Sequence, residues 1–393
     1  MPFVVKQSFL NSNLPLNYSK KMNELLKYQI GITLIKGIGP NLAKNLIAYL
    51  GSVEAVFREK KQNLAKIPGI GEVLSNEITS QDVMKRAEEE AAFILKNKIE
   101  TFFFTHKSYP YRLRECPDSP IMLYYKGSTS LNEGKFIGIV GTRKATEAGK
   151  DICKNLIHDL AASVPNITIV SGLAYGVDIC AHKACVEGDI ATLGVLGHGL
   201  DRIYPAVHRP SAVKMIQNGG LLTEYMSGTN PDKPNFVQRN RIIAGMCDAL
   251  IVVESGRRGG ALITAELAND YNRDVFAVPG RIGDEFSAGC NKLIKQNKAS
   301  LIESADDIIR FMSWEVSPSS DSKQAVQRVL FENLSDEEQT IIAHLRQFPD
   351  GINVNELTVQ LNKPYSKLSS QLLEMEFKGL VKCLPGGMYR VVK

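Results

Sequence analysis

The chain has 393 residues, which is too long for one simple hydrophobic core and predicts two to four domains. Its composition is that of an ordinary globular protein, with 44% hydrophobic and 23% charged residues, and no apolar run approaches membrane-spanning length. The formal net charge of +5 permits a nucleic-acid partner without requiring one, because local clustering matters more than the total.

The cysteines and the N-terminus point to a soluble protein of the cytoplasm. None of the seven cysteines forms a CxxC pair, which suits reduced thiols, and the first residues lack the features of a signal peptide. The segment CAHKAC, with Cys180, His182 and Cys185, has the residue types of a metal site. No second Cys/His cluster completes a tetrahedral set, so we interpret these residues as buried on a helix and predict no metal.

The first third of the chain is predicted to be helical. Residues 1–20 are polar and rich in Asn and Ser, and we interpret them as a loose leader. Residues 21–105 contain two similar turns, IKGIGPNLAKNLI and AKIPGIGEVLSNEI, in which glycines permit a tight turn and leave backbone N–H groups able to meet a phosphate. The pair resembles two helix-hairpin-helix motifs of a SAM-like domain, which hold DNA backbones. A purely structural helical unit is equally favoured, because few Lys or Arg flank the second turn.

Residues 106–312 are predicted to form an α/β domain. A preamble, SYPYRLRECPDSPIMLYYKG, has prolines and aromatics suited to extended or edge structure. Short, almost wholly apolar runs then alternate with helical stretches: KFIGIVG, ITIVSG, ATLGVL, GLLTEY, ALIVVES, DVFAVPG and SLIE. Such runs are typical of parallel strands covered on both faces, so the pattern predicts a doubly wound, mostly parallel sheet.

The last part of the chain is predicted to be a linker and a winged helix. Residues 313–332 indicate a linker that turns helical towards its end. Residues 333–393 begin with a capping signal, Ser335 with Glu338, followed by two further helical patterns and two strands around a Pro-Gly-Gly turn. From Phe331 to Lys393 there are 7 Lys and Arg against 8 Asp and Glu, a net charge of −1.

The candidate ligand-binding residues follow the predicted strands, because open parallel sheets bind ligands beyond the carboxyl ends of their strands. In GIVGTRKATEAGK, Gly141 lets a ligand approach the backbone, Thr142 offers a hydroxyl and Arg143 offers a planar fork for phosphate. The GxGxxG dinucleotide fingerprint is absent.

The next loop, SGLAYGVDICAH, brings Gly172, Gly176 and Asp178 to the same edge. Asp178 is a candidate base, although a capping or buried hydrogen-bonding carboxylate is the more common role. The loop ESGRRGGALITAE adds Arg257, Arg258, Gly259 and Gly260 at a helix start, where anions bind readily.

A basic segment, PDKPNFVQRNRIIAG, follows the fourth predicted strand. We expect Lys233, Arg239 and Arg241 to join Arg143 along one rim, with Phe236 between them. A cationic groove with an interleaved aromatic is typical of single-stranded nucleic-acid sites. In the alternative, Phe236 belongs to the core and one arginine caps a carbonyl. We interpret Asn240 as fixing the geometry of a loop.

No catalytic constellation is evident. His182, His198 and His208 are isolated, and no nucleophile has a partner base at a recognisable spacing. The sequence therefore predicts a protein that binds rather than catalyses, without a cofactor.

Taken together, these segments resemble the DNA-processing protein A family, also called DprA or Smf. The matching blocks run in family order from Tyr109 to Ile294: YPYRL, IGIVGTRKATEAG, SGLAYGVDICAH, TLGVLGHGLDRIYP, FVQRNRIIAG, GGALITAELA, VFAVPG and GCNKLI. The resemblance implies an extended Rossmann core that binds single-stranded DNA as a homodimer and delivers it to the recombinase RecA in natural transformation.

By motif match, the resemblance places Gly141, Thr142 and Arg143 in the family's phosphate loop. It places Lys233, Phe236, Arg239 and Asn240 in the second DNA-contacting segment. Three departures are that Thr142 replaces the usual serine, that Gly259 stands where serine is common, and that KQNKAS lacks a glycine before Ala299.

A second resemblance gives an alternative function. GGALITAE looks like the PGGxGTxxE loop of phosphoribohydrolases of the lysine-decarboxylase-like family, which cleave nucleoside monophosphates, with Glu266 as the catalytic glutamate. Arg258 replaces the proline and the internal Gly-Thr is absent, so we rank this alternative lower.

Overall fold

The structure is a computed structural model that describes residues 16–80, 83–314, 335–348, 351–384 and 386–391. It divides into two compact units, Met1–Val316 and Ser317–Lys393. Of the expected leader, residues 1–15 lie outside the described residues, and residues 16–20 already belong to the first helix. The expected linker lies outside the described residues from position 315 onwards.

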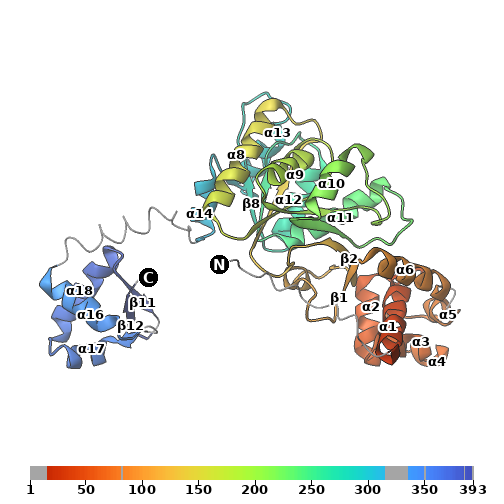
Figure 1. Cartoon of the computed structure of the whole chain (residues 1–393), viewed down its shortest axis with the longest axis horizontal. Coiled ribbons are helices and arrows are strands. Elements are labelled where there is room, and N and C mark those ends of the chain that lie inside the picture. The colour runs from red at the N-terminus through yellow and green to blue at the C-terminus, as the bar shows by residue number, and fades with distance from the viewer. Residues whose placement is uncertain (1–15, 81–82, 315–334, 349–350, 385, 392–393) are drawn as a thin grey trace. The chain divides into compact units, whose positions relative to one another are not determined.

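The first unit begins with six helices: α1 (Leu16–Leu34), α2 (Pro40–Leu50), α3 (Val53–Arg58), α4 (Lys61–Leu64), α5 (Glu72–Ser80) and α6 (Met84–Asn97). The two Gly-Ile-Gly turns precede α2 and α5, and their first glycines, Gly37 and Gly69, have φ angles of 82° and 83°. Only glycine adopts this left-handed conformation without steric cost, which explains the repeated motif. The helices pack against β1 and β2 of the following sheet (Figure 1) through Phe103, Met122 and Tyr124.

A nine-stranded sheet forms the centre of this unit, in the order β1-β2-β6-β5-β4-β3-β7-β8-β9. Its strands are β1 (Glu100–Phe103), β2 (Met122–Gly127), β3 (Lys135–Val140), β4 (Ile167–Ser171), β5 (Ala191–Val195), β6 (Gly219–Thr223), β7 (Ala249–Val252), β8 (Asp274–Ala277) and β9 (Ser300–Leu301). All seven predicted apolar runs form the strands β3 to β9, and these seven strands are parallel to one another. The prediction of a doubly wound, mostly parallel sheet is confirmed.

The other two strands lie outside the predicted apolar runs. β2 is antiparallel to β6, and β1 is antiparallel to β2. The preamble expected to be extended or edge structure forms the short helix α7 (Tyr111–Arg114) and then β2, which is extended but lies inside the sheet rather than at its edge. The expected domain boundary after residue 105 falls between β1 and β2, which pair with each other. The N-terminal helices and the sheet belong to one compact unit.

Helices cover both faces of the sheet because successive side chains of each strand point to opposite faces. From β3, Phe136 and Val140 pack with α11 (Lys233–Met246) and α12 (Gly260–Asp270), whereas Ile137 and Ile139 pack with α8 (Glu147–Ser163) and α9 (Val177–Glu187). The remaining elements are η1 (Ala206–His208), α10 (Arg209–Met215), α13 (Ala288–Lys295) and α14 (Ala305–Phe311).

The second unit has the predicted winged-helix plan. Its elements are α16 (Asp336–Leu345), β10 (Ile352–Asn353), α17 (Val354–Gln360), α18 (Tyr365–Phe377), β11 (Val381–Leu384) and β12 (Met388–Val391), with the strands ordered β10-β12-β11. Ser335 and Glu338 form the expected capping box. In the predicted Pro-Gly-Gly turn, Pro385 lies outside the described residues, and Gly386 and Gly387 have positive φ angles. Within the ranges that the structure describes, no helix combines the length and apolarity needed to cross a membrane.

Candidate nucleic-acid interface

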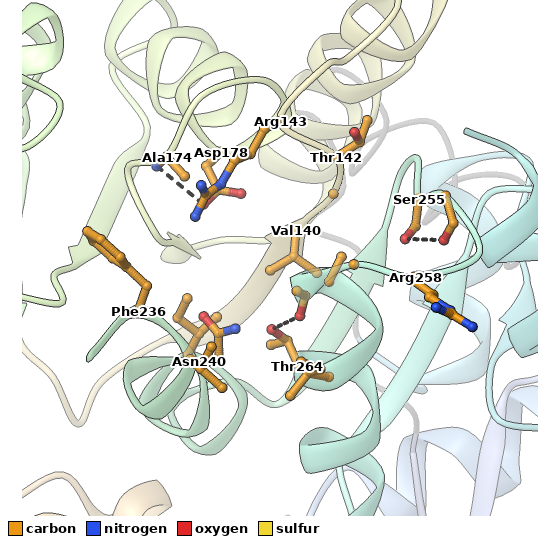
Figure 2. A pocket seen from close by; sticks show the side chains of 18 of the residues that line it. Val140, Thr142, Arg143, Ala174, Asp178, Phe236, Asn240, Ser255, Arg258 and Thr264 are labelled. Atoms are coloured by element: carbon orange, nitrogen blue, oxygen red, sulfur yellow. Dashed lines mark hydrogen bonds between the residues drawn. The ribbon is translucent and has the colours of Figure 1, made fainter. Parts of the chain in front are cut away.

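The main pocket lies where the winding of the sheet reverses. β3 pairs with β4 on one side and with β7 on the other, and helices leave these strands in opposite directions, which opens a crevice at the carboxyl ends. A pocket of about 650 Å³ occupies this position (Figure 2). Its lining comes from the loops after β3 to β8 and from α9, α11 and α12. It carries four basic residues, Arg143, Lys233, Arg239 and Arg258, against two acidic ones, Asp178 and Glu285.

The loop after β3 places Arg143 at this pocket. The backbone N–H of Thr142 donates to the Glu254 carbonyl at 2.7 Å, and the Thr142 hydroxyl accepts from the N–H of Lys144 at 3.1 Å. A Cβ at Gly141 would lie 2.4 Å from Val177, so glycine is required for this close packing. The predicted residues Gly141, Thr142 and Arg143 all line the pocket, and the exposed Arg143 side chain extends from the loop into it (Figure 2).

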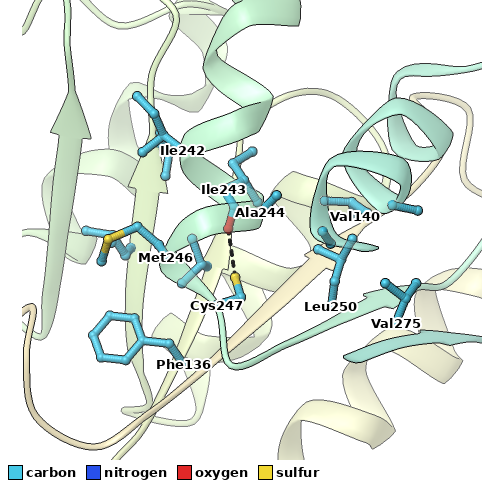
Figure 3. Packing of buried hydrophobic residues seen from close by; sticks show 14 of the residues in the cluster. Phe136, Val140, Ile242, Ile243, Ala244, Met246, Cys247, Leu250 and Val275 are labelled. Atoms are coloured by element: carbon cyan, nitrogen blue, oxygen red, sulfur yellow. Dashed lines mark hydrogen bonds between the residues drawn. The ribbon is translucent and has the colours of Figure 1, made fainter. Parts of the chain in front are cut away.

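The basic segment is helical from Lys233 onwards, where α11 begins. Lys233, Phe236, Val237 and Asn240 line the pocket at spacings of three and four residues, which place them on one helix face. The opposite side of α11 packs into the core through Ile242 and Met246 (Figure 3). Asn240 is therefore a helix residue facing the pocket, and the interpretation that it fixes a loop is wrong.

The two arginines that flank Asn240 have different positions. Arg239 lines the pocket but is only 3% exposed, and its Nη1 donates to the carbonyl oxygens of Gly172, at 2.7 Å, and of Val195. It thereby ties together the ends of β4 and β5. Burial lowers the pKa of Arg239 to about 10, while the nearby Asp178 acts in the opposite direction, so the guanidinium stays charged at neutral pH.

The expected rim position of Arg241 is not found. Arg241 is buried, forms an ion pair with Glu224 and does not line the pocket. Two residues along an α-helix correspond to about 200° of rotation, so Arg239 and Arg241 cannot share one face. The alternation RNR thus places only one arginine at the pocket.

The glycines of the loop after β4 serve packing. A Cβ at Gly172 would lie 2.5 Å from the Arg239 guanidinium, and one at Gly176 would lie 2.1 Å from the Thr142 carbonyl oxygen. Neither glycine lines the pocket. Asp178 does line it, and its Oδ2 accepts from the N–H of Ala174 at 3.4 Å. Burial raises the pKa of Asp178, which fits the interpretation as a buried hydrogen-bonding carboxylate.

The loop after β7 leads into the first turn of α12. Arg258, Gly259 and Gly260 line the pocket, whereas the adjacent Arg257 does not. Gly259 is the N-cap of α12 and supplies no side chain, so the N–H groups of this turn remain open to an anion. Both arginines are exposed, and Figure 2 shows Arg258 at the pocket edge opposite Phe236.

Sequence reasoning missed several lining residues, notably Tyr204, Ser255 and Phe286. Tyr204 is 49% exposed, and its ring centroid lies 5.6 Å from that of Phe236. It follows β5, so the strand-end rule that found the other loops could also have identified it.

The residues weighed for catalysis or metal binding lie elsewhere or are buried. Glu266 is exposed, forms a 3.1 Å ion pair with Lys298 and does not line the pocket. Cys180, His182 and Cys185 are buried on α9, where Nδ1 of His182 lies 2.8 Å from the Thr192 hydroxyl. Within the described ranges, no group of three or more His, Cys, Asp or Glu is arranged to hold a metal ion.

Comparison with known proteins identifies the family. The model described as DNA recombination-mediator protein A matches residues 100–313, the DprA winged helix domain matches residues 329–387, and a SAM-like helix-hairpin-helix tandem matches residues 31–81. Protein Smf from Synechocystis is 34% identical over 72% of this chain and 71% of its own length, and the DNA processing protein DprA from Bacillus subtilis is 40% identical over 53% and 70%. The X-ray structure of DNA processing protein A from Streptococcus pneumoniae covers 73% of this chain and 96% of its own, with 32% identity and a TM-score of 0.63. The chain therefore belongs to the DNA recombination-mediator protein A family, the DprA/Smf proteins.

Proposed function

We propose that this protein binds single-stranded DNA in the pocket at the carboxyl ends of β3 and β7. The observation that carries the proposal is the combination of exposed cations and an aromatic wall in that pocket. Arg143, Lys233 and Arg258 are exposed, and within the described part of the chain their side chains form no ion pair. Their charges are available to neutralise phosphates.

The aromatic wall favours a single strand over a duplex. A ring can stack on a base only when the face of that base is uncovered, and in a duplex neighbouring bases cover both faces. Tyr204 and Phe236 provide such a wall beside the cations. Stacking and backbone charge together give tight binding with little sequence preference.

Membership of the family supports the further steps of the proposal. We propose that Gly141, Thr142, Arg143, Lys233, Phe236, Asn240, Arg258, Gly259 and Gly260 contact the strand, while Arg239 shapes the pocket and Arg241 takes no part. The protein acts as a homodimer and passes the bound strand to the recombinase RecA in natural transformation. Seven free cysteines, six of them buried, suit the reducing cytoplasm as its compartment.

The phosphoribohydrolase alternative is not favoured, because its catalytic glutamate would be Glu266, which pairs with Lys298 outside the pocket. We accordingly propose a binding protein without catalytic activity. Incubation with AMP should release no adenine.

Neighbouring arginines provide the test of the proposed function. Arg257 and Arg258 are both exposed, but only Arg258 lines the pocket. We expect Arg258→Ala to weaken binding of a fluorescent single strand about 5- to 30-fold, the range that follows from losing one charge-assisted phosphate contact. The matched Arg257→Ala variant should stay within about twofold of wild type. Equal effects of the two substitutions, or preference of the wild type for duplex of equal length, would contradict the proposal.

A further inference from the structure

Two aromatic side chains of the pocket differ in what their rings can still contact. The ring of Phe236 packs against the backbone of Gly197, where an added Cβ would lie 2.8 Å from its Cδ1. Phe236 also contacts the ring of Tyr204, with 5.6 Å between centroids and 31° between planes. Phe236 is therefore partly covered, whereas Tyr204 remains 49% exposed at the outside of the pair.

The backbone of Tyr204 is fixed by a buried histidine. The N–H of Tyr204 donates to Nε2 of His198 at 3.2 Å, and Nδ1 of His198 lies 2.9 Å from the carbonyl oxygen of Gly199. A backbone N–H can only donate, so Nε2 accepts and the proton of the neutral ring resides on Nδ1. Burial lowers the pKa of His198, which maintains this neutral form. The backbone at Tyr204 is thus held in place before a ligand arrives, which reduces the cost of ordering this residue on binding.

Of the exposed cations, Lys233 lies on α11 three residues before Phe236, whereas Arg258 lies apart from the aromatic pair. Arg258 and the first turn of α12 form the pocket edge opposite Phe236 (Figure 2). A nucleotide with its phosphate at Arg258 and the first turn of α12 would therefore direct its base towards the aromatic side. The outermost surface that it meets there is the exposed ring of Tyr204 rather than the partly covered ring of Phe236.

We infer that Tyr204 is the base-stacking platform of the pocket, with Phe236 as the inner ring that supports it and His198 as a positioning residue. The ligand of this subsite is one unpaired nucleobase of a DNA strand, recognised by its π-face. This inference rests on the proposed function and names the residue that receives the base. Because every base has a π-face, the subsite tolerates any sequence.

The test compares two tyrosines of equal exposure on the full-length chain. Tyr204 and Tyr175 are 49% and 50% exposed, but Tyr175 contacts His208 and does not line the pocket. A thymine oligonucleotide that carries one 2-aminopurine reports stacking by fluorescence quenching, and a labelled copy reports affinity by anisotropy. We expect Tyr204→Ala and the bulk-retaining Tyr204→Leu to abolish the quenching and weaken binding at least fivefold. Tyr204→Phe and Tyr175→Ala should retain both signals within twofold.

Each contrary result identifies which proposal fails. If both Tyr204→Ala and Tyr204→Leu keep the fluorescence quenching and the affinity of wild type, the inference is overturned but the proposal of single-strand binding is not. Loss of binding in Tyr204→Phe also overturns it, because the hydroxyl rather than the ring face would then be required. A wild-type protein that binds no single strand overturns the proposed function together with the inference. Circular dichroism of each variant establishes that it is folded.

Discussion

Replacing Arg143 tests the electrostatic part of the site, and the adjacent Lys144 provides a matched control. Both side chains are exposed, but only Arg143 lines the pocket. The hydrogen bond from Lys144 to Thr142 uses the backbone N–H, so Lys144→Ala leaves the loop geometry intact. Each substitution removes one positive charge, so the two variants differ in the position of the lost charge rather than in net charge.

The expected magnitude follows from the nature of the contact. A hydrogen bond to a charged group contributes about 1.5–3 kcal/mol, and solvent screening at an exposed arginine reduces this to about 1–2 kcal/mol. Arg143→Ala should therefore weaken single-strand binding about 5- to 30-fold, while Lys144→Ala stays within about twofold. Loss of one phosphate contact should also make the slope of log K against log salt less steep by about 0.7.

Fluorescence anisotropy titrations of one labelled oligonucleotide at several salt concentrations measure both quantities. If folded Arg143→Ala has the same affinity and the same salt slope as wild type, Arg143 does not belong to the binding site. Equal losses in Arg143→Ala and Lys144→Ala would mean that net charge, not the pocket, determines the affinity.

Four further predictions follow from the structure. Deleting residues 331–393 should leave single-strand affinity within about threefold of wild type, roughly 0.7 kcal/mol. The reason is that Lys367 and Lys378 of the winged helix are paired with Glu337 and Glu338. A tenfold loss of affinity in a folded, dimeric truncation would assign DNA binding to this unit. Affinity of the wild type should fall steeply with salt and vary little among mixed sequences, so a flat salt response would contradict the cationic pocket. Glu266→Ala should bind single strands with the affinity of wild type, because Glu266 pairs with Lys298 outside the pocket. Weaker binding of a labelled strand to this variant, measured by fluorescence anisotropy, would contradict the prediction. Burial, reinforced by Arg239 and His208, lowers the pKa of His182 from 6.5 to about 3. The neutral form of His182 therefore stabilises the fold fully above pH 6.5, and this contribution declines by about 2 kcal/mol between pH 6.5 and 5. The stability difference between wild type and His182→Gln should shrink over that pH range, and a constant difference in melting temperature would argue against this prediction.

Sequence reasoning predicted the parallel part of the sheet because each of its strands is an apolar run bounded by turn signals. β1 and β2 lack that signal: Glu100 and Thr101 begin β1, and prolines and aromatics precede β2. β2 depends on pairing with β6 and on packing against α1, and β1 depends on pairing with β2; no local pattern specifies these long-range contacts.

The binding site shows the same division. Gly141, Arg143 and Arg258 were predicted because they follow strands, and strand ends converge at the switch point of the sheet. Arg241 was misplaced because residue 240 was expected in a loop, whereas residues two apart on the helix α11 face different sides. Tyr204 also follows a strand and was within reach of the same rule, but its contact with Phe236 arises only when the loop after β5 meets α11.

The most direct test of the central claim is to map where a single strand touches the protein. A thymine oligonucleotide substituted with 5-iododeoxyuridine is irradiated in complex with the full-length chain, and the cross-linked peptides are identified by mass spectrometry. We predict cross-links within the segments that contain Tyr204 and residues 233–240, which are lost on competition with unlabelled single strand but not with duplex of equal length. Cross-links confined to the helical residues 21–97 or to the winged helix, with these pocket segments unlabelled, would contradict the account.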